Sequence, residues 1–278
     1  MTTCKLCREV RPLRRSHISP QFITDWLRKS SLTGKLRGIL KPNLRLQDTF
    51  KEKMLCDDCE GLFSRYEKQF AEKIFKPVLD SYMPSVIPDE AILNFIISLS
   101  WRALILDMGK DVWKSETHQA AAHKAEENWR EYLLGKKTLQ INQHHMMMLR
   151  LMEGAPVIAG TDVDINWYFF RGVDMTVGQS HEEAFLYVKV PGLAFFSSFY
   201  ERPFSLLTGT RIVPGKLIHF FQQNADSEVF NFLRVRAYET LTPFSKMSSR
   251  QKAKINQDWL KNTKKGLHPL VGAILRSR

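Results

Sequence analysis

The four cysteines of the chain fall in two Cys-x2-Cys pairs, Cys4 with Cys7 and Cys56 with Cys59, separated by 48 residues. A Cys-x2-Cys turn places two thiolates on one side of a tight loop, at a separation that suits two corners of a tetrahedron. Two such turns complete a closed four-coordinate site, which is typical of structural rather than catalytic zinc. Because no cysteine is left over, we predict that these residues bind one structural Zn²⁺ and join two distant segments of the chain.

The setting of the cysteines favours metal over disulfides. The N-terminal sequence MTTCKLCREVRP has no apolar segment behind a basic start, so we expect a cytoplasmic protein without a secretory signal. In a reducing compartment paired cysteines hold metal more often than they form disulfides. The longest apolar stretch, residues 91–106, is about one turn too short to span a bilayer. We therefore expect a buried helix there and no membrane partner.

The net charge of +12 is concentrated at the two ends of the chain. Residues 1–55 carry 13 Lys and Arg against 4 Asp and Glu, and residues 243–278 carry 9 against 1, whereas the segment between them is net negative. Clustered basic charge indicates a polyanionic partner, because neutralising phosphates releases condensed counterions. We therefore predict a nucleic-acid partner, most naturally DNA; basic termini that merely aid solubility are the alternative.

The hydrophobic patterns predict an α+β fold in two parts. Residues 1–75 hold all the cysteines and form the first part, and residues 76–278 form the second. Within the second part, residues 76–150 read as helical, and we expect the neighbouring His144 and His145 there to be structural rather than metal ligands. Residues 155–240 are rich in Val, Phe and Tyr between turn residues and predict an antiparallel sheet. Residues 243–278 read as a basic helix or tail.

The second cysteine pair opens a predicted helix. In the segment EGLFSRYEKQFAEKIF, Leu62, Tyr66, Phe70 and Ile74 recur at helical spacing. The two aspartates between Cys56 and Cys59 suit the positive N-terminus of such a helix. A cysteine knuckle, a hairpin-like excursion and a helix that carries the second pair form the layout of a treble-clef zinc fold.

The motifs CKLC, SHISP and LCDDCE resemble the HNH, or ββα-metal, endonuclease superfamily, and also a group of uncharacterised bacterial proteins with similar SHxxP and LCxxCE motifs. The resemblance covers about the first 70 residues, roughly a quarter of the chain. It implies that His17 is the general base, taking a proton from the water that attacks phosphorus. It also implies that Glu60 binds a catalytic Mg²⁺ or Mn²⁺, which prefer oxygen ligands. Glu67, two turns further along the helix, would complete the metal shell or pair with a nearby arginine.

The sequence departs from the family pattern beside the proposed base. Ser16 stands where the family has a metal-binding residue, and Asn43 and Gln47 are only loosely spaced candidates for the asparagine that orients the base. The resemblance further suggests that basic residues near the motifs, namely Arg14, Arg15 and Arg45, hold the substrate phosphates.

Three functions therefore stay open at this stage. The first is a metal-dependent nuclease that hydrolyses DNA phosphodiesters, with defence of a bacterium against foreign DNA as an analogy. The second is a zinc-stabilised module that binds nucleic acid without cutting it. The third is a module that docks a protein partner, or a second copy of the chain through the C-terminal region. No Gly-rich phosphate loop, nucleophile elbow or dinucleotide fingerprint is present in the sequence.

Overall fold

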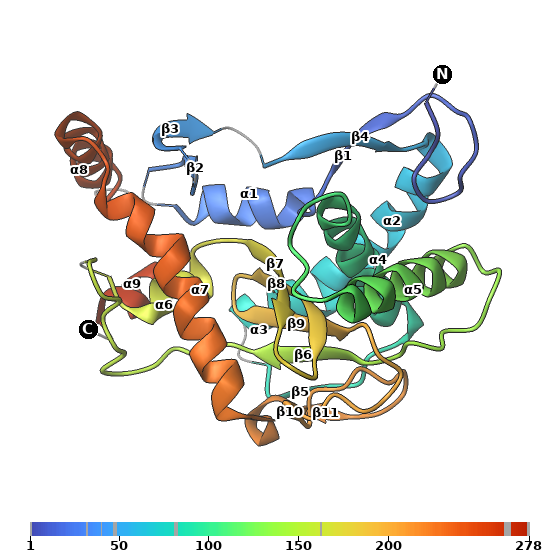
Figure 1. The fold of residues 1–278 in the computed structure, drawn as a ribbon. Helices are drawn as coiled ribbons and strands as arrows, with labels where there is room; N and C mark the ends of the chain where they lie inside the picture. Colours follow the sequence, from blue (N-terminus) through green and yellow to red (C-terminus); the bar gives the residue numbers. More distant parts are fainter. Residues whose placement is uncertain are drawn as a thin grey trace.

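A computed structural model describes the chain over residues 2–31, 33–39, 41–46, 49–80, 83–161, 163–263 and 268–276. These residues form mixed α and β structure, with the four cysteines gathered near the N-terminus. Figure 1 shows the N-terminal elements along one side of a central sheet, with helices on both of its faces.

The central sheet is antiparallel and has the strand order β6 (His144–Met148), β9 (Leu193–Ser198), β8 (Ala184–Val190), β7 (Asp174–Gln179). Every residue of β8 and β9 is buried, so both faces of these strands are covered. Successive side chains of a strand point to opposite faces. Leu186 accordingly packs on the side of helices α4 (Glu90–Asp107) and α5 (Glu116–Leu133), whereas Tyr187 packs on the side of α6 (Ile165–Phe170) and α7 (Ser227–Ser245).

Helix α4 is the buried helix that the apolar stretch predicts. Its N-cap Asp89 accepts a hydrogen bond from the backbone N–H of Ile92, and twelve of its side chains are buried, Arg102 among them. Helix α5 begins in the same way, because the Ser115 side chain accepts from the N–H of His118. None of the described helices is both long and apolar enough to cross a bilayer.

The N-terminal region is built from two strands that pair across a long excursion. Strand β1 (Arg14–His17) pairs antiparallel with β4 (Lys51–Leu55), and α2 (Asp57–Phe70) follows directly. The excursion between the strands contains α1 (Gln21–Lys29) and the hairpin of β2 (Leu36–Gly38) and β3 (Lys41–Leu46). The predicted helix after the second cysteine pair is thus present, and it continues through a π-helical turn, η1 (Ala71–Phe75), into α3 (Lys76–Asp80).

The apolar core is continuous between the cysteine-bearing region and the rest of the chain. Phe70 stacks on Phe95 of α4 with ring centroids 4.0 Å apart, and both rings meet Phe195 of β9 edge-on. Beside them, Phe63 of α2 packs edge-on against Trp101 of α4. These contacts place α2 against the same helix that covers the sheet.

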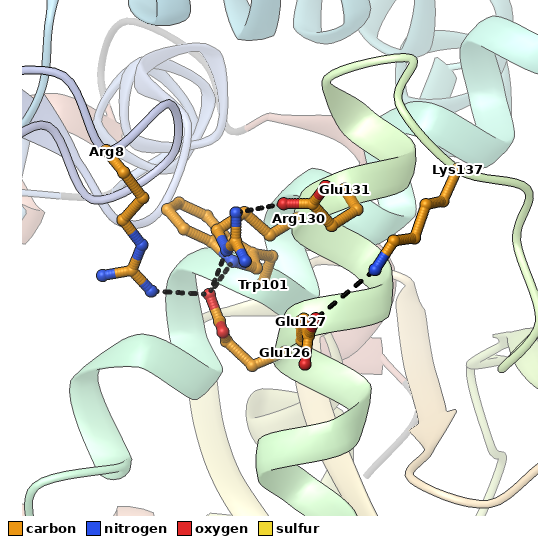
Figure 2. Close-up of polar contacts among 7 residues, drawn as sticks. All are labelled: Arg8, Trp101, Glu126, Glu127, Arg130, Glu131 and Lys137. Atoms are coloured by element: carbon orange, nitrogen blue, oxygen red, sulfur yellow. Dashed lines mark hydrogen bonds and ion pairs between the residues drawn. The ribbon is translucent and has the colours of Figure 1, made fainter.

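Figure 2 shows a polar contact between the first cysteine loop and helices α4 and α5. The buried carboxylate of Glu126 accepts a hydrogen bond from Trp101 Nε1 at 3.0 Å. The same carboxylate pairs with Arg8, just after Cys7, and with Arg130, each at 3.4 Å. One buried carboxylate therefore ties the loop to both helices.

Three sequence predictions within residues 76–240 are wrong. His144 and His145 lie on strand β6 rather than in a helix, and INWYFF forms helix α6 rather than a strand. In a short apolar run, periodicity alone cannot distinguish a helix from a strand. Helix α7 also lies within the predicted sheet region, although its buried residues Val229, Leu233 and Ala237 recur every four positions, as a helix requires.

Short elements and two C-terminal helices complete the described structure. Strand β5 (Ser85–Val86) pairs with β11 (Ile218–His219), and β10 (Leu207–Thr208) pairs with β12 (Asn224–Ala225). A 3-10 turn, η2 (Phe220–Gln222), lies between β11 and β12. The C-terminal helices are α8 (Ser249–Thr263) and α9 (Pro269–Arg276).

Helix α8 packs against the β2–β3 hairpin, more than 200 residues earlier in the chain (Figure 1). Arg37 Nη2 donates to Gln251 at 3.3 Å, and Arg45 Nη2 pairs with Asp258 at 2.8 Å. The basic C-terminal segment thus lies beside the basic N-terminal region.

Candidate metal centre and basic ladder

The two cysteine pairs meet at one point, and their four sulfur atoms all lie within 4.8 Å of one another. A tetrahedral zinc ion with Zn–S bonds of about 2.3 Å requires sulfurs about 3.8 Å apart. The distance between the sulfurs of Cys7 and Cys56 is 3.9 Å, which fits this requirement. The four cysteines are therefore placed so that they can bind a metal ion such as zinc.

The first pair is held by a tight turn of the backbone. The N–H of Arg8 donates to the Cys4 carbonyl at 3.0 Å, and Arg8 adopts the left-handed conformation with φ at 65°. This conformation is uncommon for a residue with a β-carbon, so the salt bridge to Glu126 and the turn hydrogen bond stabilise it here. The N–H of Lys5 donates to the carbonyl of Met54 at 2.8 Å, which attaches the turn to strand β4.

The second pair is presented by the start of helix α2. Cys56 is the N-cap residue, with extended backbone angles, and Cys59 lies in the first turn of the helix. Burial opposes ionisation of the Cys4 thiol, but backbone N–H groups, the one of Cys56 foremost, outweigh it and lower the pKa of Cys4. Burial raises the pKa values of Cys7 and Cys59, so without a cation these thiols favour the protonated form. A bound metal would reverse that preference, because metal ligation requires thiolates.

The β1–β4 ladder has two chemically different faces. The register pairs Ser16 with Glu52, and it pairs Arg15 with Lys53 and His17 with Lys51. Directly paired residues lie on the same face of an antiparallel ladder, and alternate pairs share a face. One face therefore carries Arg15, His17, Lys51 and Lys53, of which Arg15 and Lys53 are exposed and the other two are half-buried.

The opposite face of the ladder points toward helix α2. The Ser16 side chain is fully buried, and its hydroxyl donates to Glu60 Oε2 at 2.6 Å. Ser16 thus holds the carboxylate that the resemblance assigns to a catalytic metal. Among the residues that the structure describes, only the four cysteines form a group of three or more His, Cys, Asp or Glu able to hold a metal ion.

Glu67 is engaged by an arginine that the sequence reasoning did not single out as a partner. Its carboxylate pairs with Arg102 Nη1 at 2.7 Å, and the same nitrogen donates to the backbone carbonyl of His17 at 3.0 Å. Of the two roles predicted for Glu67, the structure therefore has the ion pair with a nearby arginine. A lone Arg within the apolar stretch of residues 91–106 was the sequence signal for such a buried pair.

Two of the three arginines predicted to hold phosphate face carboxylates. Arg14 pairs with Asp57 of α2, with a second contact at 3.2 Å, and Arg45 pairs with Asp258 of α8. Arg15 is exposed and makes no ion pair within the described part of the chain. The candidate orienting residue Asn43 accepts a hydrogen bond from the N–H of Ser248 and so positions the C-terminal region; Gln47 lies outside the described residues.

Comparison of the chain with known protein families, with curated proteins and with solved structures gives no match.

Proposed function

We propose that this chain is a DNA-binding protein whose N-terminal region is a treble clef built on one structural zinc ion. The observation that carries the proposal is the outward face of the β1–β4 ladder, where Arg15, Lys53 and Lys51 surround His17. The cysteine cluster supports it because a closed set of four thiolates stabilises a fold rather than activating water. Zinc would fix strand β4 and helix α2 to the first cysteine turn, and so fix the position of that basic face.

The charge distribution supports a nucleic-acid partner over a protein partner. Arg15 and Lys53, two exposed cationic side chains directly opposite each other on the ladder, suit the phosphates of a nucleic-acid backbone. Residues 1–55 have a net charge of +9, and helix α8, which packs beside them, has a net charge of +3. Contacts of this kind position a protein on a duplex without reading its sequence. We therefore expect affinity that depends strongly on salt and weakly on base sequence.

Hydrolysis of DNA is the second candidate, and the observation behind it is the Glu60 carboxylate, which Ser16 holds beside the ladder. Mg²⁺ is held in many phosphoryl-transfer sites by one or two carboxylates together with substrate phosphates, and Glu60 supplies one. The bound ion would stabilise charge on phosphorus and on the leaving oxygen. His17 points to the opposite face of the ladder from Ser16 and Glu60, and this separation is why hydrolysis ranks second. If the DNA backbone passes around the end of strand β1, His17 would take the proton of the attacking water as the new P–O bond forms and the ester P–O bond breaks, and the leaving oxygen would take a proton from solvent. The proton would then pass from the imidazole to solvent.

Salt-dependent binding tests the first proposal. Fluorescence anisotropy with labelled duplex DNA would be measured from about 50 to about 250 mM salt for the wild type, for Arg15→Ala/Lys53→Ala and for the matched control Lys136→Ala/Lys216→Ala, whose two lysines are exposed and lie outside both basic ends of the chain. Each lost phosphate contact lowers the slope of log K against log salt by about 0.9. We expect the slope to fall by about 1.8 in the ladder variant and to stay near wild type in the control. Equal slopes in all three proteins would refute the proposed face.

A cleavage assay separates the two candidates. Supercoiled plasmid would be incubated with Mg²⁺ or Mn²⁺ and with wild type, His17→Ala or the exposed control His123→Ala. Nicking that His17→Ala abolishes and His123→Ala retains would establish the nuclease. Salt-dependent binding with no nicking by any of the three proteins would leave the binding function and exclude hydrolysis of this substrate.

A further inference from the structure

An apolar cleft lies on the side of the sheet away from the cysteine cluster, between the end of β6, helix α6, the turn η2 and the start of α7. Its volume is about 500 Å³, within the range of about 300–1,000 Å³ that is common for small-molecule sites. Leu149, Phe169 and Leu233 are buried and line it, whereas Met152 and Phe230 are exposed members of its lining. Phe230 keeps 61% of its surface accessible, which is high for an aromatic side chain beside an apolar cleft.

The polar side chains in the lining are few, and their chemistry restricts the ligand. They are Gln223, Arg150 and Arg234, and no acidic side chain lines the cleft. Both ends of the Gln223 amide are committed to β6, because Nε2 donates to the Met146 carbonyl at 2.8 Å and Oε1 accepts from the Met148 N–H at 2.9 Å. The lining therefore has no amide or hydroxyl side chain left to form hydrogen bonds with a nucleobase or a sugar.

The two arginines provide positive charge without a competing carboxylate. Arg150 is held in place because Nη2 donates to the Phe220 carbonyl at 2.8 Å and its guanidinium lies 4.3 Å from the ring centroid of Phe221. Arg234, on α7, donates to the side chain of Asn231 at 2.9 Å. Both side chains are exposed, and neither forms an ion pair within the described part of the chain. A guanidinium suits a carboxylate, which it can bind through two parallel hydrogen bonds.

We propose that this cleft binds one long-chain fatty acid, with the acyl chain against the apolar lining and the carboxylate at Arg150 and Arg234. Most of the ligand must be apolar because the lining offers almost no hydrogen-bonding groups. One end of the ligand must be anionic because the only charged groups in the lining are the two guanidinium groups. This site is separate from the basic ladder, and its ligand is independent of the function proposed there.

Binding of the fluorescent fatty acid cis-parinarate to the full-length, delipidated protein tests the site. Below the critical micelle concentration of the probe, we expect one saturable site per chain. Palmitate should displace the probe at least tenfold more effectively than hexadecanol, which has the same chain without the charge. A lack of saturable binding, or equal displacement by hexadecanol, would overturn the proposal.

Exposed residues allow variants that leave the core intact. We expect Arg150→Glu/Arg234→Glu to weaken binding at least tenfold, whereas Lys216→Glu/Lys246→Glu, with the same change in net charge, should bind as the wild type does. Phe230→Asp should also weaken binding, while Tyr238→Asp, an exposed aromatic further along α7 and outside the lining, should not. Thermal unfolding confirms that each variant is folded. Equal effects in the variants and their controls would show that the probe binds elsewhere.

Discussion

The ion pair between Arg102 and Glu67 joins the end of strand β1 to helices α2 and α4. The Arg102 side chain is only 2% exposed and the Glu67 side chain 21%, so the pair lies largely out of water. Arg102 also donates from Nε to the Ser98 carbonyl at 3.3 Å and from Nη1 to the His17 carbonyl. Its guanidinium lies 5.3 Å from the ring centroid of Phe63. The arginine therefore supports both the ladder and the helix that carries Glu60.

Removing one partner of this pair should cost much of the stability of the fold. Breaking a buried pair costs about 3–5 kcal/mol, because the remaining charge is left without a partner, out of a total of about 5–15 kcal/mol for a typical protein. We expect Arg102→Leu to destabilise the protein by about that amount, and Glu67→Gln by roughly 1–3 kcal/mol because the amide still accepts a hydrogen bond. Arg102→Leu/Glu67→Gln should recover roughly 2 kcal/mol relative to the sum of the two single changes.

Urea unfolding of the zinc-loaded protein, followed by circular dichroism, gives these differences as a double-mutant cycle. Glu72→Gln is the matched control, because Glu72 is an exposed carboxylate on the same run of helix. The reasoning fails if Glu67→Gln costs no more than Glu72→Gln. If Glu67→Gln leaves stability unchanged but abolishes metal-dependent nicking, Glu67 is a ligand of the catalytic metal instead.

Two further predictions concern the C-terminal helix and the buried histidines. Asp258→Asn should release Arg45 to contact a phosphate, which would steepen the slope of log K against log salt by about 0.9. The control Asp111→Asn, which changes an exposed carboxylate elsewhere, should leave that slope unchanged. An unchanged slope in Asp258→Asn would show that Arg45 does not reach DNA. Burial lowers the pKa of His144 to about 3 and of His145 to about 4, so between pH 6.5 and about 4 the unfolded chain binds more protons than the folded one. Stability should therefore fall on acidification through that window, by about 1.4 kcal/mol per pH unit per histidine. Urea unfolding would be measured against pH for the wild type and for His144→Asn/His145→Asn, each with and without a chelator. The chelator distinguishes titration of the histidines from loss of a bound metal in acid. Parallel stability profiles for the two proteins would contradict the role of the histidines.

Local patterns in the sequence were sufficient for several features of the structure. The spacing of Cys4, Cys7, Cys56 and Cys59 predicted that two distant segments meet, and their sulfurs do lie together. The apolar stretch predicted α4, and the four-residue recurrence after Cys59 predicted α2, because a buried helix face repeats with that period. The antiparallel sheet was also predicted, and its strands β7 to β9 lie within the expected region.

The features that the sequence did not reveal depend on contacts between distant residues. No local pattern pairs Arg45 with Asp258, which lie 213 residues apart. The helical reading of His144 failed because a strand of five residues carries too few positions to separate a period of two from one of 3.6. The roles of Ser16 and Glu60 follow from tertiary packing in the same way, since their hydrogen bond joins two elements across the whole excursion.

The most direct measurement is the metal content of the folded protein by native mass spectrometry. We expect one zinc ion per chain, with the mass of four deprotonated cysteines, and loss of both the ion and the folded N-terminal region in Cys59→Ser. A natively folded chain that carries no metal, or one that contains a disulfide between the two cysteine pairs, would contradict the zinc-stabilised N-terminal fold and the DNA-binding face of the β1–β4 ladder that depends on it.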